Sequence, residues 1–310
     1  DDAGFFERAI TSVTRDQELR PDELVVVVDG PVPDPIAAVL RRTEAGELTA
    51  GAPVRVVALP TNLGLAGALQ AGLAACRHEV VARADADDVS LPQRFARQVP
   101  LMADVDLLSS AVVEFEADEA QHGLQRAWPA DPEEIARLAR LADPFNHPSV
   151  VYRRSAMAAA GGYQHLARLE DYWLFVRMLH AGARVTNVAD PLVLYRVGAG
   201  AYRRRGGWEL FRSELVLQGR MLRLGFTTPA QFARNLVLGK SDFAPNSEAP
   251  IHQAAEWARD HLADDCGFAD ARAAGDDAQR IGESPFNSLS LGGVEAEKEI
   301  AKAVVRHWPG

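Results

Sequence analysis

The sequence predicts an α/β protein, in which helices flank both faces of a mostly parallel sheet. Two β-branched runs, Glu23–Asp29 and Val54–Leu59, are apolar with little alternation, which is typical of strands buried on both faces. Segments with apolar residues at helical spacing alternate with such runs, as a parallel sheet requires. Ligands bind at the carboxyl ends of the strands in sheets of this kind, so we expect functional residues directly after the strands.

The first half of the chain supplies these elements in order. A helix is expected first, because apolar residues recur at helical spacing from Phe5 to Val13. The following elements are then expected: a strand at 23–29 that ends in Asp29-Gly30, a strand at 54–59, an Ala- and Leu-rich helix at 65–77, and a strand at 79–85 that leads into an acidic loop.

The second half continues the pattern and then departs from it. The expected elements are a strand within 104–116, helices after Pro132, at 155–160 and up to Gly182, one or two strands within 184–197, and an amphipathic helix over 206–225. Residues 239–250 have the composition of a linker, and helices are expected near 251–262 and 294–305. The chain is thus divided into regions 1–200, 201–240 (a helical extension) and 241–310, the last an acidic helical tail to which we assign no role.

Composition excludes several classes of protein. The net charge is -10, and region 241–310 supplies -7 of it from thirteen acidic residues against six Lys or Arg, so no basic face for nucleic acid is implied. Cys76 and Cys266 are far apart in the sequence and lack metal-ligand spacing, so neither a disulfide framework nor a zinc site is suggested, and we expect Cys76 in the core. No membrane-spanning run and no secretory leader is visible, so we expect a cytoplasmic protein.

The loop "ARADADDVSLP" at residues 82–92 brings Asp85, Asp87 and Asp88 within four positions. Carboxylates so close together repel one another unless a cation or a ligand offsets their charge. Mg²⁺ and Mn²⁺ prefer oxygen ligands, and Mg²⁺ is usually held by one or two carboxylates together with phosphates and water. The loop therefore predicts a divalent metal site. The alternative is a solvated loop in which Ser90 caps a helix that begins near Leu91-Pro92.

A longer series of motifs carries a resemblance. The segments "FFERAITSV", "DELVVVVDG", "NLGLAGALQAGL", "ARADADDVSLPQRFARQV", "FNHPSVVYRRS", "GGY" and "LEDYWLFVRMLHAG" follow one another within residues 5–240. In this order they resemble the family 2 glycosyltransferases, particularly bacterial polysaccharide-building enzymes of the amylovoran type. The resemblance implies the Rossmann-like GT-A fold and an inverting transfer from a UDP- or GDP-sugar to a saccharide or lipid-linked acceptor. It also implies a DXD motif at Asp85-Ala86-Asp87 that binds Mg²⁺ or Mn²⁺.

Several donor-side residues follow from the resemblance. It implies that Asp29 contacts the nucleoside, that Asn62 and Gly64 form a turn lining the donor, and that Arg83 helps to hold the donor. Within the acidic loop it implies that the earlier acid, Asp85, faces the ribose and that a later acid binds the metal. It does not decide whether that acid is Asp87 or Asp88. In the family an initial strand and a Pro-x-Tyr/Phe-Asn turn line the base. The sequence starts after that position, so we assign no residue to recognition of the nucleotide base.

The acceptor side needs a carboxylate that takes the proton of the attacking hydroxyl group. The resemblance implies that Asp171, in the pair Glu170-Asp171, is this base. It places His147 in a loop beside the active site, where the side chain contacts either donor phosphates or the acceptor. Tyr163 and Trp173 are candidates for stacking on a sugar ring.

Arg203, Arg204 and Arg205 precede the amphipathic helix. They either hold a pyrophosphate or seat the helix on an anionic surface, with peripheral contact at the inner face of the cell membrane. Each assigned position also has a structural interpretation: turn residues for Asp29, Asn62 and Gly64, surface arginines for Arg83 and Arg203–Arg205, a structural loop residue for His147, first-turn helix acids for Glu170 and Asp171, and core aromatics for Tyr163 and Trp173.

Two other functions fit parts of the sequence. "DADDVS" and "GDDAQ" at 275–279 superficially resemble the acidic motifs of haloacid-dehalogenase-like phosphatases, but none of the lysines, Lys240, Lys298 and Lys302, stands between those motifs in the expected setting. A non-catalytic carbohydrate- or metal-binding module would use the acidic loop but would give Asp171 no role.

Overall fold

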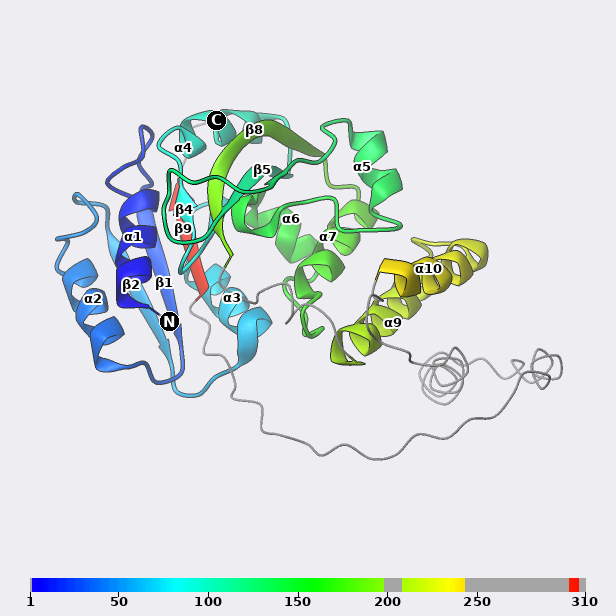
Figure 1. Cartoon of the computed structure of the whole chain (residues 1–310), viewed down its shortest axis with the longest axis horizontal. Coiled ribbons are helices and arrows are strands. Elements are labelled where there is room, and N and C mark those ends of the chain that lie inside the picture. Colours follow the sequence, from blue (N-terminus) through cyan, green and yellow to red (C-terminus); the bar gives the residue numbers. More distant parts are fainter. Residues whose placement is uncertain (1, 198–207, 243–300, 307–310) are drawn as a thin grey trace. The chain divides into compact units, whose positions relative to one another are not determined.

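The computed structural model describes residues 2–197, 208–242 and 301–306 of the chain. It forms two compact units, one of residues 1–205 with 298–310 and the other of residues 206–297. The first unit contains the sheet and the helices that pack on it (Figure 1).

The elements of the first unit follow the predicted order. They are α1 (Ala3–Val13), β1 (Glu23–Asp29), α2 (Asp34–Glu44), β2 (Val54–Leu59), α3 (Gly64–Ala75), β3 (Val80–Asp85), β4 (Val89–Ser90), α4 (Arg94–Gln98), η1 (Pro100–Ala103), β5 (Leu107–Phe115), β6 (Gln125–Arg126), α5 (Pro132–Leu138), η2 (His147–Ser149), β7 (Val151–Arg153), α6 (Arg154–Ala159), α7 (Glu170–His180), β8 (Val185–Arg196) and β9 (Ala301–Arg306). Helix α2 is an addition to the sequence-based expectation.

The sheet has the strand order β2-β1-β9-β3-β7-β5-β8-β4, and β6 pairs with β5. Strands β1 and β2 are parallel, as are β5 and β8, whereas β9, β7, β4 and β6 run antiparallel to their neighbours. The strands β2, β1, β3, β5 and β8 therefore all point in one direction. The predicted α/β class is confirmed, and the carboxyl ends of these five strands share one edge of the sheet.

Helices cover both faces of the sheet, and β1 shows why its sequence is apolar throughout. Leu24, Val26 and Val28 pack in one core with α1, α2 and α4, whereas Val25 and Val27 pack in the other with α3, α6 and α7 (Figure 1). Successive strand residues point to opposite faces, so a strand between two helical layers must be apolar at every position. Cys76 is 2% exposed in the second core, as predicted.

The helix expected near 294–305 is wrong over its last residues, because Ala301–Arg306 forms strand β9. This strand lies between β1 and β3 and pairs with both in the antiparallel sense. The helix-favouring composition of the segment is overridden here by backbone pairing, since β9 satisfies the hydrogen-bonding groups of two strands at once. The expected helix near 251–262 lies outside the described residues.

The acidic loop also continues differently from the predicted capped helix. Val89–Ser90 forms the short strand β4 beside β8, and α4 begins only at Arg94, with no side-chain cap. The Ser90 hydroxyl accepts a hydrogen bond from the Arg94 guanidinium (2.9 Å). Ser90 thus anchors a buried side chain rather than a helix end.

The second unit has two described helices, α9 (Trp208–Arg223) and α10 (Pro229–Asp242). The amphipathic helix predicted over 206–225 is confirmed as α9. Leu215, Leu217 and Met221 of α9 are buried. Over the described part of the chain, no helix combines the length and apolar character that crossing a bilayer requires.

Candidate active site

The candidate site lies at the edge of the sheet where β1 and β3 end. Asp29 closes β1, and Asp85 closes β3. Strand β7 runs antiparallel beside β3 with Val151 opposite Ala82, so the turn η2 that precedes β7 lies at the same edge. The topology therefore brings His147, on η2, toward the acidic loop after β3.

Asp29 is buried and fixes the turn after β2. Its Oδ1 accepts a hydrogen bond from the backbone N–H of Leu63 (2.6 Å), and the Asn62 side chain accepts one from the N–H of Gly64 (2.9 Å). Gly30 has φ of +89°, and a Cβ there would stand 3.0 Å from the Asn62 nitrogen, so only glycine lets the two turns approach so closely. The other carboxylate oxygen of Asp29, Oδ2, is buried and has no hydrogen-bond partner among the described residues.

Arg83 and Asp85 form an ion pair on the last residues of β3. The Arg83 NH2 lies 2.8 Å from Asp85 Oδ1, and the Arg83 side chain is 5% exposed against 23% for Asp85. A buried guanidinium at this point attracts negative charge to the end of the strand. Both residues were expected on the donor side, and the structure brings them into contact.

Asp87 and Asp88 occupy different environments, although they are neighbours. Asp87 is exposed, whereas Asp88 is 5% exposed and its Oδ1 accepts a hydrogen bond from the backbone N–H of Arg196 (2.8 Å). Burial, together with the charges of Asp85 and Asp87, raises the pKa of Asp88 well above its usual range. Its Oδ2 is buried without a hydrogen-bond partner in the described structure. Asp88 therefore ties the acidic loop to the end of β8.

Arg94, which was not predicted from the sequence, contacts residues on either side of the acidic loop. Its guanidinium is fully buried and donates hydrogen bonds to the backbone oxygen of Arg83 (2.7 Å), to Ser90 Oγ (2.9 Å) and to Gln98 Oε1 (3.1 Å). Burial lowers the pKa of this guanidinium to about 9, and the charges of Asp85 and Asp88 partly oppose that shift. The sequence signal that could have indicated this buried residue is an arginine among the apolar residues of "RFARQV".

Asp171 lies in the first turn of α7. Its Oδ2 contacts the Nδ1 of His147, while its Oδ1 is buried and lacks a hydrogen-bond partner among the described residues. Burial raises the pKa of Asp171 to about 7, and the positive charge of Arg83 opposes this shift. A helix N-terminus would lower the pKa of a carboxyl group, so desolvation is the larger effect here. Asp171 is thus a buried carboxyl group whose pKa lies near neutral pH.

Two further carboxyl groups interact electrostatically with Asp171. Burial and the charge of Asp171 raise the pKa of Glu170 to about 7. The same two causes raise the pKa of Asp143 well above its usual range. Asp143 was not singled out from the sequence, although it stands four residues before His147 in "DPFNHPS". Together they give this side of the site an acidic character.

The predicted sugar-stacking aromatics are buried in this structure. Tyr163 is 6% exposed and Trp173 is 7% exposed. The Trp173 Nε1 donates to Gln164 Oε1 (2.9 Å), and the Arg177 guanidinium lies 5.2 Å from the centre of its ring. Neither ring presents an open face to a sugar, so the core interpretation describes both residues better.

No group of three or more His, Cys, Asp or Glu side chains arranged to hold a metal ion is present in residues 2–197, 208–242 or 301–306. The acidic loop thus offers separate carboxylates rather than a complete cage. Arg203, Arg204 and Arg205 lie outside the described residues, so their predicted roles stay predictions.

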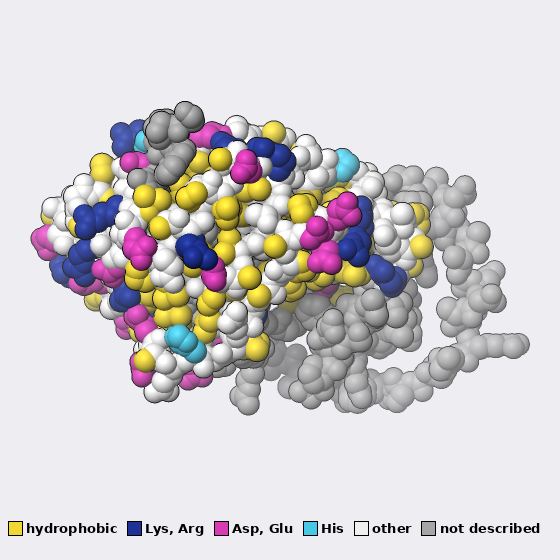
Figure 2. Space-filling view, turned by 90° about the horizontal axis from the view of Figure 1, so that it is seen from above, with side chains coloured by type: hydrophobic (Ala, Val, Ile, Leu, Met, Phe, Trp, Pro, Cys, Tyr) yellow, Lys and Arg dark blue, Asp and Glu magenta, His cyan; other side chains and the backbone are white. Residues whose placement is uncertain are grey.

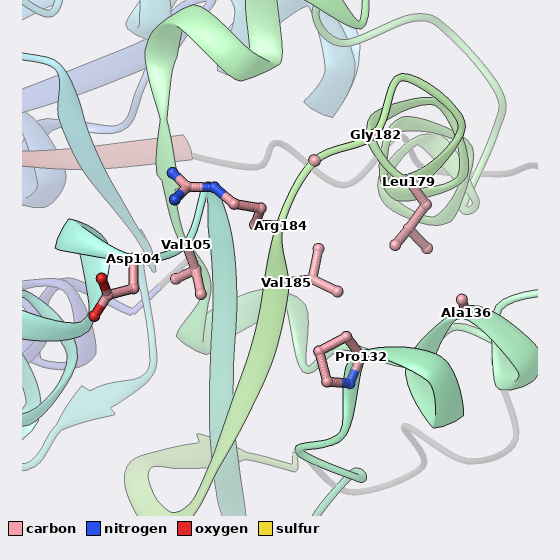
Figure 3. Close-up of a pocket in the computed structure, with 9 residues that line it drawn as sticks. Asp104, Val105, Pro132, Ala136, Leu179, Gly182, Arg184 and Val185 are labelled. Atoms are coloured by element: carbon pink, nitrogen blue, oxygen red, sulfur yellow. The ribbon is translucent and has the colours of Figure 1, made fainter.

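A surface hollow of about 460 Å³ lies at the opposite edge of the sheet, where β5 and β8 begin (Figure 3). Its lining is largely apolar and includes Val105, Pro132, Leu179 and Val185. None of the predicted site residues lines it. The face in Figure 2 intersperses acidic and basic side chains with hydrophobic ones, without a continuous basic surface.

Comparisons with known proteins identify the family of the chain. A family model described as "Glycosyl transferase family 2" matches residues 3–159. The amylovoran biosynthesis glycosyltransferase AmsE of Erwinia amylovora is 41% identical over 206 residues, which cover 65% of this chain and 74% of the relative. An Escherichia coli relative, named UDP-Gal:alpha-D-GlcNAc-diphosphoundecaprenol beta-1,3-galactosyltransferase, is 30% identical over 240 residues, 75% of this chain and 83% of its own.

The fold also matches solved structures. The mannosyltransferase PcManGT from Pyrobaculum calidifontis, solved in complex with GDP-Man and Mn²⁺, superimposes with a TM-score of 0.54 at 18% identity. The match covers 83% of this chain and 77% of that one. At this identity the likeness concerns the fold alone, and that fold is the GT-A fold expected from the sequence.

Proposed function

The chain belongs to glycosyl transferase family 2 and is a glycosyltransferase. On that basis we propose that it transfers a sugar, with inversion, from a nucleotide-diphosphate sugar to a hydroxyl group of a saccharide or lipid-linked acceptor. We propose Asp171 as the general base. The observation that carries this proposal is the state of Asp171. One of its carboxylate oxygens is held by His147, and the other is buried without a partner among the described residues. Such an atom is suited to accept a proton from a bound hydroxyl group.

The donor is assigned to the ends of β1 and β3. Asp29 Oδ2 is a buried acceptor that a nucleoside hydroxyl group could satisfy, and the Arg83–Asp85 pair offers both a cation and a carboxylate. A nucleotide-diphosphate sugar carries both hydroxyl groups and a diphosphate. PcManGT binds GDP-Man, and the Escherichia coli relative is named for UDP-Gal, which supports this class of donor.

A divalent cation fits the acidic loop only in a partial site. The described residues give no cage of three ligands, so donor phosphates and water would have to complete the coordination, as is usual for Mg²⁺. Asp87 is the exposed carboxylate and would be the main ligand, with Asp85 beside it. Asp88 is buried and hydrogen-bonded to Arg196. When bound, the cation would offset charge on the departing diphosphate.

In the proposed reaction, the acceptor hydroxyl oxygen attacks the anomeric carbon from the face opposite the diphosphate. The new oxygen–carbon bond forms as the bond to the diphosphate oxygen breaks, and the nucleoside diphosphate leaves with that electron pair. Asp171 Oδ1 takes the hydroxyl proton. Attack from the opposite face inverts the configuration at the anomeric carbon. Neither the phosphatase nor the binding-module alternative is retained, because the family assignment supports a sugar transferase.

The test separates donor binding from transfer. Wild type and Asp171→Asn are titrated with UDP-galactose and GDP-mannose, with Mn²⁺ and with EDTA, and followed by thermal shift. Release of nucleoside diphosphate is then measured with saccharides and with an α-D-GlcNAc-diphospholipid as acceptors. We expect metal-dependent binding in both proteins and a loss of about 10²- to 10⁴-fold in the transfer rate of the variant. Full transfer by Asp171→Asn would refute the assigned base, and retention of configuration would refute inversion.

A further inference from the structure

His147 uses both nitrogens of its ring within the protein. Its Nδ1 contacts Asp171 Oδ2, and its Nε2 lies 3.4 Å from the hydroxyl oxygen of Tyr163. The Tyr163 hydroxyl is also hydrogen-bonded to that of Tyr152, which is 1% exposed. Four side chains thus form one chain of polar contacts that ends at the proposed base.

Counting the protons fixes the direction of these contacts. Above pH 7, where Asp171 is ionised, its carboxylate only accepts hydrogen bonds, so the proton between His147 and Asp171 is on Nδ1. Burial lowers the pKa of His147 well below its usual range, and the charge of Arg83 acts in the same direction. With Nδ1 as the donor the ring is neutral, and its Nε2 has a lone pair that can accept the Tyr163 hydroxyl proton, in which case the Tyr163 oxygen accepts from the Tyr152 hydroxyl group.

The surroundings hold this chain in place. Gly162 has φ of +65°, and the backbone N–H of Tyr163 donates to Gln70 Oε1 (2.9 Å). The His147 ring stands edge-on to Phe175 of α7, with ring centres 5.8 Å apart. Because packing and backbone contacts restrain both His147 and Tyr163, the contact with Asp171 has little freedom to rotate.

We propose that His147 and Tyr163 are positioning residues that hold Asp171 by its Oδ2, so that Oδ1 faces the acceptor hydroxyl group. This inference rests on the proposed role of Asp171 as the base. It gives the two residues roles that differ from those expected from the sequence, since His147 acts on the base and not directly on donor or acceptor. Tyr163 acts on His147 and not on a sugar ring.

Two histidine substitutions separate positioning from packing. In His147→Asn the side-chain amide nitrogen falls near the place of Nδ1 and can still donate to Asp171, whereas in His147→Gln it falls near the place of Nε2. We expect His147→Gln to lower the transfer rate by about 10- to 100-fold, with donor and acceptor KM within about twofold of wild type, and His147→Asn to keep most of the rate. His122→Gln, a change at an exposed histidine, is the control.

The pH profile gives a second readout. A hydrogen bond to the charged form lowers the pKa of a carboxyl group, so loss of the His147 contact should move the inflection of the rate to higher pH. The other titratable and charged groups around this carboxylate are unchanged in the two His147 variants: Arg83 and Asp85 on β3, Asp143, Glu170 on α7, the hydroxyl groups of Tyr152 and Tyr163, and His165, which acts on Glu170. The shift therefore reports on His147 itself.

The decisive measurement needs no turnover. Ring-nitrogen chemical shifts of His147, recorded at pH 8 on ¹⁵N-histidine-labelled full chain and assigned with His147→Asn, should show a neutral ring protonated on Nδ1. Asp171→Asn and Tyr163→Phe should each change that pattern. Unchanged shifts in both variants, or equal rate losses in His147→Gln and His147→Asn with an unmoved pH inflection, would overturn the inference. Full transfer by Asp171→Asn would instead overturn the proposed base, so the two failures are distinguishable.

Discussion

The change Asp171→Asn should stabilise the protein at alkaline pH while it removes the proposed base. Burial raises the folded-state pKa of Asp171 from 3.8 to about 7. A carboxyl group with a raised pKa contributes stability in acid that is lost as the pH rises through about 7, because the unfolded chain then holds fewer protons than the folded one. About three pH units at about 1.4 kcal/mol each set an upper limit of about 4 kcal/mol at pH 8. An amide avoids this loss because it does not ionise.

The assay is thermal and urea unfolding of wild type and variant between pH 4 and pH 8. We expect the variant to exceed wild type by about 2–4 kcal/mol at pH 8, and the difference to shrink to about 1–2 kcal/mol at pH 5 and toward zero near pH 4. We expect less than the upper limit because the neighbouring Glu170 also has a raised pKa of about 7, and its charge interacts with that of Asp171. Glu44→Gln, at an exposed position, should show no comparable pH dependence. A variant no more stable than wild type at pH 8, or one with an advantage independent of pH, would refute the reasoning.

Three further outcomes follow from the same structure. Arg94→Met should lower the free energy of unfolding by about 2–5 kcal/mol, because three buried acceptors lose their donor. The control Arg97→Met, on the exposed side of α4, should have a free energy of unfolding within about 0.5 kcal/mol of wild type. Urea unfolding measures both variants. Gly162→Ala should cost about 1–3 kcal/mol, since φ of +65° disfavours alanine and its Cβ would meet a glutamine side chain; equal stability by the same assay would contradict this. Asp87→Asn should abolish the Mn²⁺ dependence of donor binding, whereas Asp88→Asn should keep it; calorimetric titration decides, and the opposite pattern would reassign the metal ligand.

Much of the fold, and the placement of two acids at the ends of strands, followed from the sequence, because both depend on local patterns. Continuous apolar runs marked the buried strands, and the acids that close those strands, Asp29 and Asp85, necessarily lie at one edge of the sheet. Arg94 was not predictable in the same way, because its burial depends on α4 packing against the sheet. The contact between His147 and Asp171 joins η2 to the first turn of α7, two separate elements, so no spacing could indicate it.

Strand β9 was the clearest failure of local reasoning. The segment near 294–305 is rich in Ala, Glu and Lys, which favour helices. Its last residues instead form a strand, because both neighbouring strands offer backbone partners. Propensity is a weak guide wherever long-range pairing competes with it.

The position of β9 also has a consequence for how the chain folds. Its residues pair with β1 and β3, which come from the opposite end of the sequence, so the strand order cannot be completed until residue 306 has been synthesised. Before then, β1 and β3 each have an unpaired edge, which is the kind of surface that joins other chains. Pairing across almost the whole sequence also makes this step slow. The yield of folded protein should therefore depend on how quickly the last strand reaches its place.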